Sequence, residues 1–305
     1  LRRILYTLEF LHKRFILISM QQNLVSIIIP CYNSAHYILE TIKSIVDQKN
    51  ISIEIILVDD GSTDDLKSKI LSLDEPCIQY HYQANKGVSV ARNHGYSFAN
   101  GEYIVFFDAD DLMTDGFLSS RINTFIKEKN IDFVCAEVQK FNDNGLIDGV
   151  FNGASSNAIN EILLYDNTII TCPSNYMFKK VFLDKNNLSF NQKLSSTADR
   201  YFIVKCSMVG NGFLLKKTGK LLYRVSENSM SHQLTHRLVF DNQVYYEELI
   251  KHQLIPENIR NKSLFLGNFI LFASYWKIGE KRKASIFAFY SFVKSPFRFV
   301  KKCIS

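Results

Sequence analysis

The stretch Tyr103-Ile104-Val105-Phe106-Phe107-Asp108-Ala109-Asp110-Asp111 decides the fold. Its five apolar residues predict a β-strand buried on both faces. Carboxylates follow at the C-terminal end of this strand, which is where an α/β sheet binds its ligands. Residues two apart in an extended segment project to the same side, so we expect Asp108 and Asp110 to face one crevice. Two hard oxygen ligands suit Mg²⁺ or Mn²⁺; the alternative is a strand-end turn capped by Asp.

Strands and helices alternate on the N-terminal side of this stretch. Apolar runs predict strands at 25–29, 53–58 and 78–82, and helical spacing or capping signals follow each of them. Such alternation is typical of a parallel sheet with right-handed crossovers. Beyond residue 111 the pattern loosens: it predicts helices at 117–129 and 198–209, strands at 132–138, 175–178 and 213–224, a loop at 142–160, and helices from 236 onward. The fold class is therefore α/β, a mostly parallel sheet flanked by helices, with a helical C-terminal extension.

Charge is distributed unevenly along the 305 residues, whose net charge is +6. Residues 277–305 carry eight Lys and Arg against Glu280, and residues 1–19 carry four against Glu9, so the middle of the chain is mildly acidic. This distribution argues against a nucleic-acid-binding core and favours an anionic surface met by the ends. Six scattered cysteines without a Cys-x-x-Cys pair fit a reducing cytoplasm. No apolar run reaches the length of a membrane span.

The C-terminal tail combines apolar and basic residues at helical spacing. Such a pattern is typical of a helix that lies in a membrane interface, and the alternative is a core-packed helix with a solvated basic face. Pro296 must break or kink this helix. The apolar residues are Ile286, Phe289, Tyr290, Val293, Phe297 and Val300, interleaved with Lys294, Arg298, Lys301 and Lys302. We therefore expect a cytoplasmic protein, with peripheral contact through 277–305 to an anionic membrane on its inner face.

Four motifs in order resemble the family 2 glycosyltransferases, which have the GT-A fold. They are Pro30-Cys31-Tyr32-Asn33, Asp59-Asp60-Gly61-Ser62, Asn85-x-Gly87-x-x-x-Ala91-Arg92-Asn93-x-Gly95 and Asp108-Ala109-Asp110-Asp111. The resemblance is sharp over 25–115, looser over 170–232, and absent from residues 1–19 and the tail. It implies an inverting transferase that uses a UDP-sugar and Mn²⁺ or Mg²⁺.

The resemblance also implies a set of residues for the nucleotide sugar. Pro30 and Tyr32 would pack against uracil, and Asp60 would accept the hydrogen bond of its imide N–H. Lys86 and Arg92 are the cations expected nearest the diphosphate, although Arg92 could equally pair with Asp59 or Asp108 and only shape the pocket. Asp110 is the expected metal ligand, with Asp108 on the ribose or the ion. The full set for the nucleotide sugar is Pro30, Tyr32, Asn33, Asp60, Lys86, Gly87, Arg92, Asp108 and Ala109.

Asp199 is the residue expected to act as catalytic base, because it stands near a predicted helix start after a Phe-containing segment, as in the family. The family usually has a Glu-Asp pair here, and Ala198 replaces the Glu. The alternative is that Asp199 only complements the helix dipole behind an N-cap Thr197. His232 is a further candidate for a phosphate or the metal.

These signals predict three regions: an extension over 1–19 outside the fold, a catalytic domain over 20–235 and a helical region over 236–305. The catalytic domain comprises a nucleotide-binding half, 20–115, and an acceptor half, 116–235. The predicted function is transfer of a sugar to a hydroxyl of a glycan or lipid-linked acceptor in bacterial surface polysaccharide synthesis. Two alternatives are a transferase that loads polyprenyl phosphate and a non-catalytic module that binds a sugar nucleotide.

Overall fold

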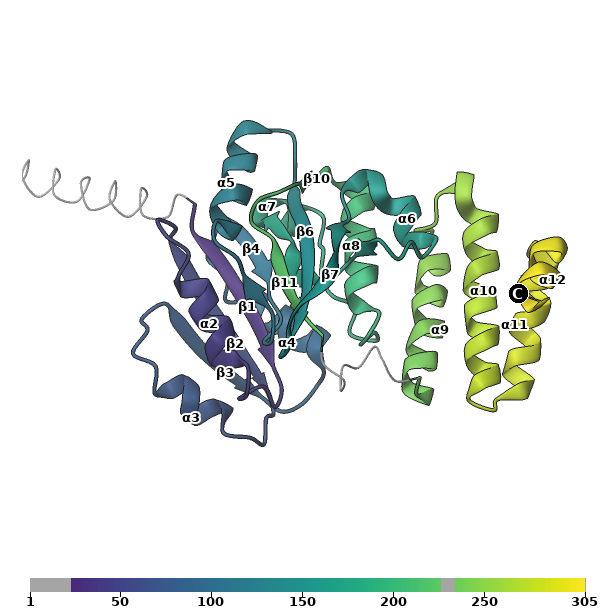
Figure 1. Ribbon diagram of the computed structural model, residues 1–305, viewed down its shortest axis with the longest axis horizontal. Helices are drawn as coiled ribbons and strands as arrows, with labels where there is room; N and C mark the ends of the chain where they lie inside the picture. The colour runs from purple at the N-terminus through teal and green to yellow at the C-terminus, as the bar shows by residue number, and fades with distance from the viewer. Residues whose placement is uncertain (1–22, 226–233, 305) are drawn as a thin grey trace, which may run out of the picture.

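The structure, a computed structural model, describes residues 23–225 and 234–304 (Figure 1). The predicted extension over 1–19 and His232 lie outside these residues. The strands are β1 (Val25–Cys31), β2 (Ile53–Asp60), β3 (Ile78–Gln83), β4 (Tyr103–Phe106), β5 (Leu112–Met113), β6 (Phe133–Asn142), β7 (Gly145–Gly153), β8 (Ile169–Ile170), β9 (Met177–Lys179), β10 (Gly212–Leu215) and β11 (Leu221–Arg224). The α-helices are α2 (Ile38–Val46), α3 (Leu66–Leu71), α4 (Val88–Tyr96), α5 (Phe117–Lys127), α6 (Ile159–Leu163), α7 (Lys180–Lys185), α8 (Ala198–Val209), α9 (His236–Lys251), α10 (Arg260–Lys277), α11 (Lys281–Lys294) and α12 (Pro296–Ile304), with 3₁₀ turns at Ser156–Ala158, Pro173–Asn175 and Glu257–Ile259.

The described strands form one mixed sheet in the order β3-β2-β1-β4-β9-β6-β11-β5, with β10 and β7 also paired to β6 and β8 paired to β7. The first four strands in this order run parallel, and β9 is antiparallel to both of its neighbours, β4 and β6. The carboxyl ends of β1, β2 and β4 therefore meet at one edge. The predicted parallel sheet is confirmed in this part of the chain, and the fold class as a whole is confirmed.

Both faces of the sheet are covered, as the continuous apolar strands predict. Ile27 and Ile29 of β1 belong to a core shared with α2, α3 and α5, whereas Ile28 between them belongs to a second core shared with α4 and α8. All three side chains are fully buried. The alternation follows from the two-residue period of a strand.

The C-terminal helices extend away from the sheet in series. Tyr245 of α9 and Leu271 of α10 belong to the second core, α10 packs between α9 and α11, and α12 packs on α11 (Figure 1). The predicted break at Pro296 is confirmed, because α11 ends at Lys294 and Pro296 opens α12. None of the described helices is both long and apolar enough to cross a membrane.

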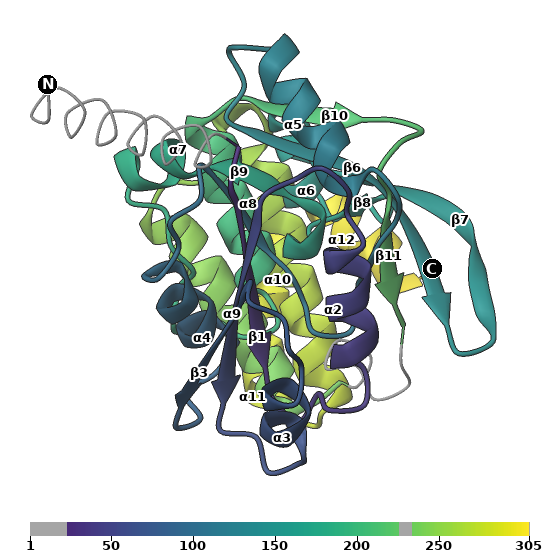
Figure 2. The same ribbon diagram turned by 90° about the vertical axis from the view of Figure 1, so that its left-hand side faces the viewer.

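The predicted loop over 142–160 is wrong, because its first half is the strand β7. This strand forms a hairpin with β6 that projects from the body of the protein (Figure 2). Leu146 and Val150 remain 70% and 50% exposed, so hydrogen bonding to β6 rather than apolar burial specifies the strand. A sequence pattern that relies on burial misses such a strand. The predicted strand over 213–224 is divided into β10 and β11 at Gly219, whose φ is +55°.

Candidate active site

The acidic loop 108–111 follows β4 and is held from two sides. From α2, Thr41 Oγ1 donates hydrogen bonds to the carbonyl oxygens of Ala109 and Asp111, both at 3.0 Å. From β11, the backbone N–H of Arg224 donates to Asp111 Oδ1 at 3.0 Å, and Arg224 Nε donates to the Asp110 carbonyl at 2.9 Å. The backbone position of the loop is therefore determined by elements on both sides of it.

Negative charge accumulates in this loop. Burial, together with the nearby Asp108, raises the pKa of Asp110 to about 6. Asp111 is fully buried, and burial followed by its two acidic neighbours raises its pKa well above the usual value. A hard divalent cation bound by these carboxylate oxygens would offset the electrostatic repulsion between them. The residues present therefore fit Mg²⁺ or Mn²⁺.

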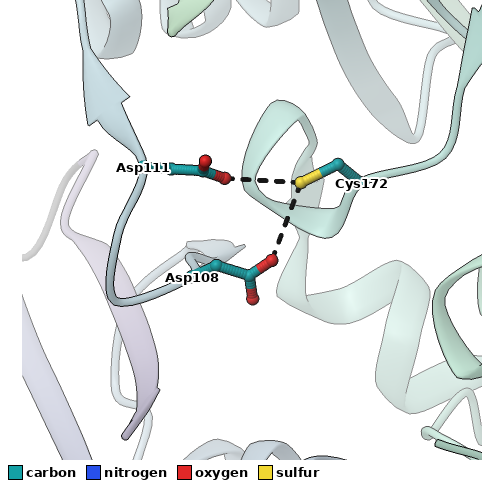
Figure 3. A group of neighbouring side chains, drawn as sticks. All are labelled: Asp108, Asp111 and Cys172. Atoms are coloured by element: carbon teal, nitrogen blue, oxygen red, sulfur yellow. Dashed lines mark hydrogen bonds between the residues drawn. The ribbon is translucent and has the colours of Figure 1, made fainter. Parts of the chain in front are cut away.

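Three side chains in the site have ligand atoms within 4.8 Å of one another: Asp108, Asp111 and Cys172 (Figure 3). The Cys172 thiol donates to Asp111 Oδ2 at 3.4 Å and to Asp108 Oδ2 at 3.7 Å. Asp110, the ligand expected from the sequence, is not part of this group. Burial raises the pKa of the Cys172 thiol well above its usual value, and the adjacent carboxylates raise it further, so the thiol stays protonated.

Arg92 of α4 lies between two carboxylates. Its Nη2 donates to Asp108 Oδ1 and its Nη1 to Asp199 Oδ1, both at 2.6 Å. Burial alone lowers the pKa of the guanidinium, but Asp199 and Asp108 together raise it above its usual value. The pairing with Asp108 is one of the alternatives expected from the sequence, whereas that with Asp199 was not anticipated. Arg92 thus connects the acidic loop with the expected catalytic base.

One face of α4 holds the segment that leads to Asp199. Ser89 Oγ donates to the Leu194 carbonyl at 2.9 Å, and the Asn93 side chain exchanges two hydrogen bonds with the Phe190 backbone at 2.9 and 3.0 Å. Ser89, Arg92 and Asn93 have the i, i+3, i+4 spacing that places side chains on one helix face. The polar residues on this face of α4 therefore connect the helix with the segment that leads to Asp199.

Asp199 lies in the first turn of α8, as predicted. Burial raises its pKa to about 6 although Arg92 lowers it, and 28% of its side-chain surface remains accessible. Thr197 occupies the N-cap position, but its hydroxyl makes no capping hydrogen bond. Instead it donates to Asp241 of α9 at 2.8 Å.

Asp241 of α9 supports the turn before Asp199, and the sequence did not predict this contact. Its two oxygens accept hydrogen bonds from the backbone N–H groups of Ser195 and Thr197 at 2.7 and 2.8 Å, and from the Ser196 and Thr197 hydroxyls at 2.7 and 2.8 Å. A carboxylate only 5% exposed thus fixes the turn that begins α8. The run Ser195-Ser196-Thr197 is rich in donors, but nothing in the local sequence indicates an acceptor more than 40 positions away.

Asp60, which the sequence places beside the uracil ring, accepts hydrogen bonds from the loop after β3. Its oxygens accept from Gln83 Nε2 at 2.7 Å and from the backbone N–H groups of Lys86 and Gly87, each at 2.8 Å. These N–H groups are therefore engaged by Asp60 in the structure. Gly87 has φ +91°, a conformation that a glycine adopts without strain.

A cavity of about 340 Å³ opens beside Asp60. Tyr32, 54% exposed, lines this cavity together with residues of the 192–195 segment and of α9. Pro30 is buried within β1 and does not line the cavity, whereas Lys86 and Gly87 do. Asn33 accepts from the Thr63 N–H at 2.8 Å and so joins the loops after β1 and β2. Aromatic, acidic and basic groups therefore converge at the edge where the parallel strands end.

The chain is similar to known glycosyltransferases. The family model described as glycosyl transferase family 2 matches residues 26–186, which is just over half of the chain. An uncharacterized glycosyltransferase of Rickettsia felis is 36% identical over 152 residues, which are 49% of this chain but only 24% of that protein. The chain is also 30% identical over 220 residues to the UDP-Glc:alpha-D-GlcNAc-diphosphoundecaprenol beta-1,3-glucosyltransferase WfgD of Escherichia coli, covering 70% of this chain and 81% of the relative.

A solved structure agrees in fold. S. aureus TarS 1–349 in complex with UDP-GlcNAc superposes with a TM-score of 0.63 at 18% identity, covering 90% of this chain and 91% of that one. At this identity the likeness concerns the fold alone. It extends beyond the family model and includes the helical C-terminal region.

Proposed function

Because the chain belongs to glycosyl transferase family 2, we propose that it transfers a sugar from a UDP-sugar, with inversion, to a hydroxyl group of a lipid-linked glycan acceptor. The observation that carries the proposal is Arg92, whose guanidinium bonds both Asp108 of the acidic loop and Asp199 of α8. The proposed donor site, through Asp108, and the proposed proton acceptor, Asp199, are thus bonded to the same buried guanidinium. The proposed setting is the synthesis of bacterial cell-surface polysaccharide.

The donor side of the reaction uses the edge where β1, β2 and β4 end. Tyr32 offers a flat surface for a pyrimidine, and the cavity beside Asp60 provides space for it. Lys86 lies at this cavity and can contact a diphosphate, whereas Arg92 is already paired with two carboxylates. Asp108 and Asp110, with the neighbouring Asp111, would hold a divalent metal ion, and such an ion stabilises the negative charge of a departing diphosphate.

The acceptor side uses Asp199. As the hydroxyl oxygen forms its bond to the anomeric carbon and the bond to UDP breaks, the hydroxyl proton passes to an Asp199 carboxylate oxygen. Arg92 engages Oδ1, which leaves Oδ2 outside this ion pair. Asp241 and the polar face of α4 restrict the segment around Asp199, and such restriction keeps a base in reach of its proton.

The acceptor proposal draws on the relative WfgD, whose name specifies a diphosphoundecaprenol-linked acceptor and UDP-Glc. We propose the same classes here, a UDP-sugar and a lipid-linked glycan, with the protein in peripheral contact with the cytoplasmic side of an anionic membrane. The identity of the sugar is outside the proposal.

The test is a panel of UDP-, GDP- and dTDP-sugars supplied with Mn²⁺ and a short diphospholipid-linked glycan. We expect release of UDP that depends on both metal and acceptor, together with a product longer by one sugar. Binding of UDP without release or transfer across the whole panel would contradict the proposal and favour a non-catalytic binding module. Transfer to polyprenyl phosphate in place of the glycan would favour the other alternative, which needs no base because that acceptor is already anionic.

A further inference from the structure

The helix α11 has one face in contact with the protein. Ala284 and Ser291 are fully buried, and Ser291 Oγ donates to the Phe265 carbonyl of α10 at 3.1 Å. On the same side Phe287 stacks on Tyr275 of α10, with ring centroids 5.5 Å apart. The inward face of α11 therefore already has its partner.

The opposite face of α11 is apolar and exposed. Ile286, Phe289, Tyr290 and Val293, here called the α11 apolar face, are 47%, 63%, 52% and 59% exposed. Their spacing places them within one sector of the helix, away from Ala284 and Ser291. Phe297, just beyond the break at Pro296, is 91% exposed. The sequence left open whether these residues cover the core, and the structure excludes that alternative.

Basic residues border this face at both ends. Lys281, Arg282 and Lys283 precede it, Lys294 and Arg298 follow it, and all five are exposed. The only acidic residue from 277 to 305 is Glu280, against eight Lys and Arg in the sequence. The face is thus a hydrophobic stripe within a positive field.

We propose that the α11 apolar face, together with Phe297, inserts into the interfacial region of an anionic lipid bilayer while the flanking Lys and Arg bind the headgroups. An amphipathic surface of this kind binds through both buried apolar area and charge. A second copy of this chain is a less favourable partner for the α11 apolar face, because a symmetric contact would bring two strongly basic surfaces together. The role of this membrane contact rests on the proposed function, since a lipid-linked acceptor is presented at a membrane surface.

The test measures sedimentation of the full chain with vesicles of phosphatidylcholine, alone or mixed with phosphatidylglycerol. The first variant combines Phe289→Ser, Val293→Ser and Phe297→Ser. The matched control combines Leu71→Ser, Leu146→Ser and Val181→Ser, three apolar residues that are 64–70% exposed elsewhere on the surface. We expect wild type and control to bind the anionic vesicles with partition coefficients within about twofold of each other, and the first variant to bind about tenfold more weakly or worse. Equal binding by the first variant and the control would overturn the proposal.

A measurement of insertion depth distinguishes insertion into the bilayer from purely electrostatic binding at its surface. The chain has one tryptophan, Trp276, so the pair Trp276→Phe and Phe289→Trp moves the reporter to the centre of the face. We expect its emission to shift to the blue and to be quenched by lipids brominated on the acyl chains. Vesicle binding without quenching would overturn insertion, as would loss of self-association, measured by ultracentrifugation, as the only effect of the serine variant. None of these measurements uses a sugar nucleotide, so their outcome is independent of the transferase assay.

Discussion

Up to residue 115, here called the first half, polar groups bind partners at neighbouring strand ends: Asp60 holds the loop after β3, and Asn33 holds the loop after β2. Beyond residue 115, here called the second half, Asp199 is bonded to Arg92, 107 positions away, and the turn before Asp199 is bonded to Asp241 of α9. Parallel topology alone brings the first set together. The second set depends on how α4 and α9 pack against the segment that leads to Asp199.

Asp110→Asn is expected to have the largest effect, because it removes charge from the donor side while keeping size and shape. Metal-dependent binding of UDP should be lost, and the fold should survive because the side chain is only partly buried. Calorimetry with UDP and Mn²⁺ measures the first effect and circular dichroism the second. Normal metal-dependent affinity would remove Asp110 from the site and leave Asp108 and Asp111 as the candidate ligands.

Asp199→Asn tests the other half and is expected to lower turnover by roughly 10²–10⁴-fold, the usual contribution of a positioned base. UDP-sugar binding should remain near that of the wild type. Because the base acts ionised and burial raises the pKa of Asp199 to about 6, wild-type turnover should fall as the pH falls through about 6. The variant should lose the contribution of Asp199 to this acid limb and keep that of Asp110, whose pKa is also raised to about 6. An equally large loss of donor binding would instead indicate a structural or donor-side role.

The two halves also differ in how far the sequence predicts them. The apolar runs and the four motifs predicted strands β1 to β4 and the edge where their polar residues meet. The same reasoning located Asp199 near the start of α8, but it could not reveal Arg92 as its partner, because an ion pair between distant residues leaves no periodic signal. Asp241 and Cys172 were missed for the same reason. Strand β7 was missed because it is specified by hydrogen bonds rather than by buried apolar residues.

Asp241→Asn is expected to have an intermediate effect on turnover. One carboxylate oxygen becomes an amide NH₂ that faces donors of the 195–197 turn, and losing hydrogen bonds to a buried charged acceptor costs about 1.5–3 kcal/mol. We expect thermal stability to fall and turnover at saturating donor to fall by about tenfold. Because Asp241 also lines the cavity beside Asp60, UDP affinity is measured separately by calorimetry.

Glu248→Gln is the matched control on the same helix. Glu248 is also buried and accepts from Asn191 and Lys193 at 2.9 and 3.2 Å, so it holds the same segment further from Asp199. This variant should lose stability but keep its turnover. Equal losses of turnover in both variants would mean that Asp241 stabilises the domain generally and does not position the base.

Cys172→Ser is expected to have the smallest effect. It distinguishes two roles for Cys172, a residue of the second half whose thiol contacts Asp108 and Asp111 of the acidic loop. If the thiol acts as a hydrogen-bond donor to Asp108 and Asp111, a serine hydroxyl can donate in its place, and UDP affinity with Mn²⁺ should stay within about threefold of wild type. If the sulfur is a metal ligand, the serine should weaken Cd²⁺ binding far more than Mn²⁺ binding, because thiolates select soft metals. Calorimetric titration of both metals decides between the roles: a selective loss of Cd²⁺ affinity would assign the sulfur to the coordination shell and extend the metal site into the second half of the domain.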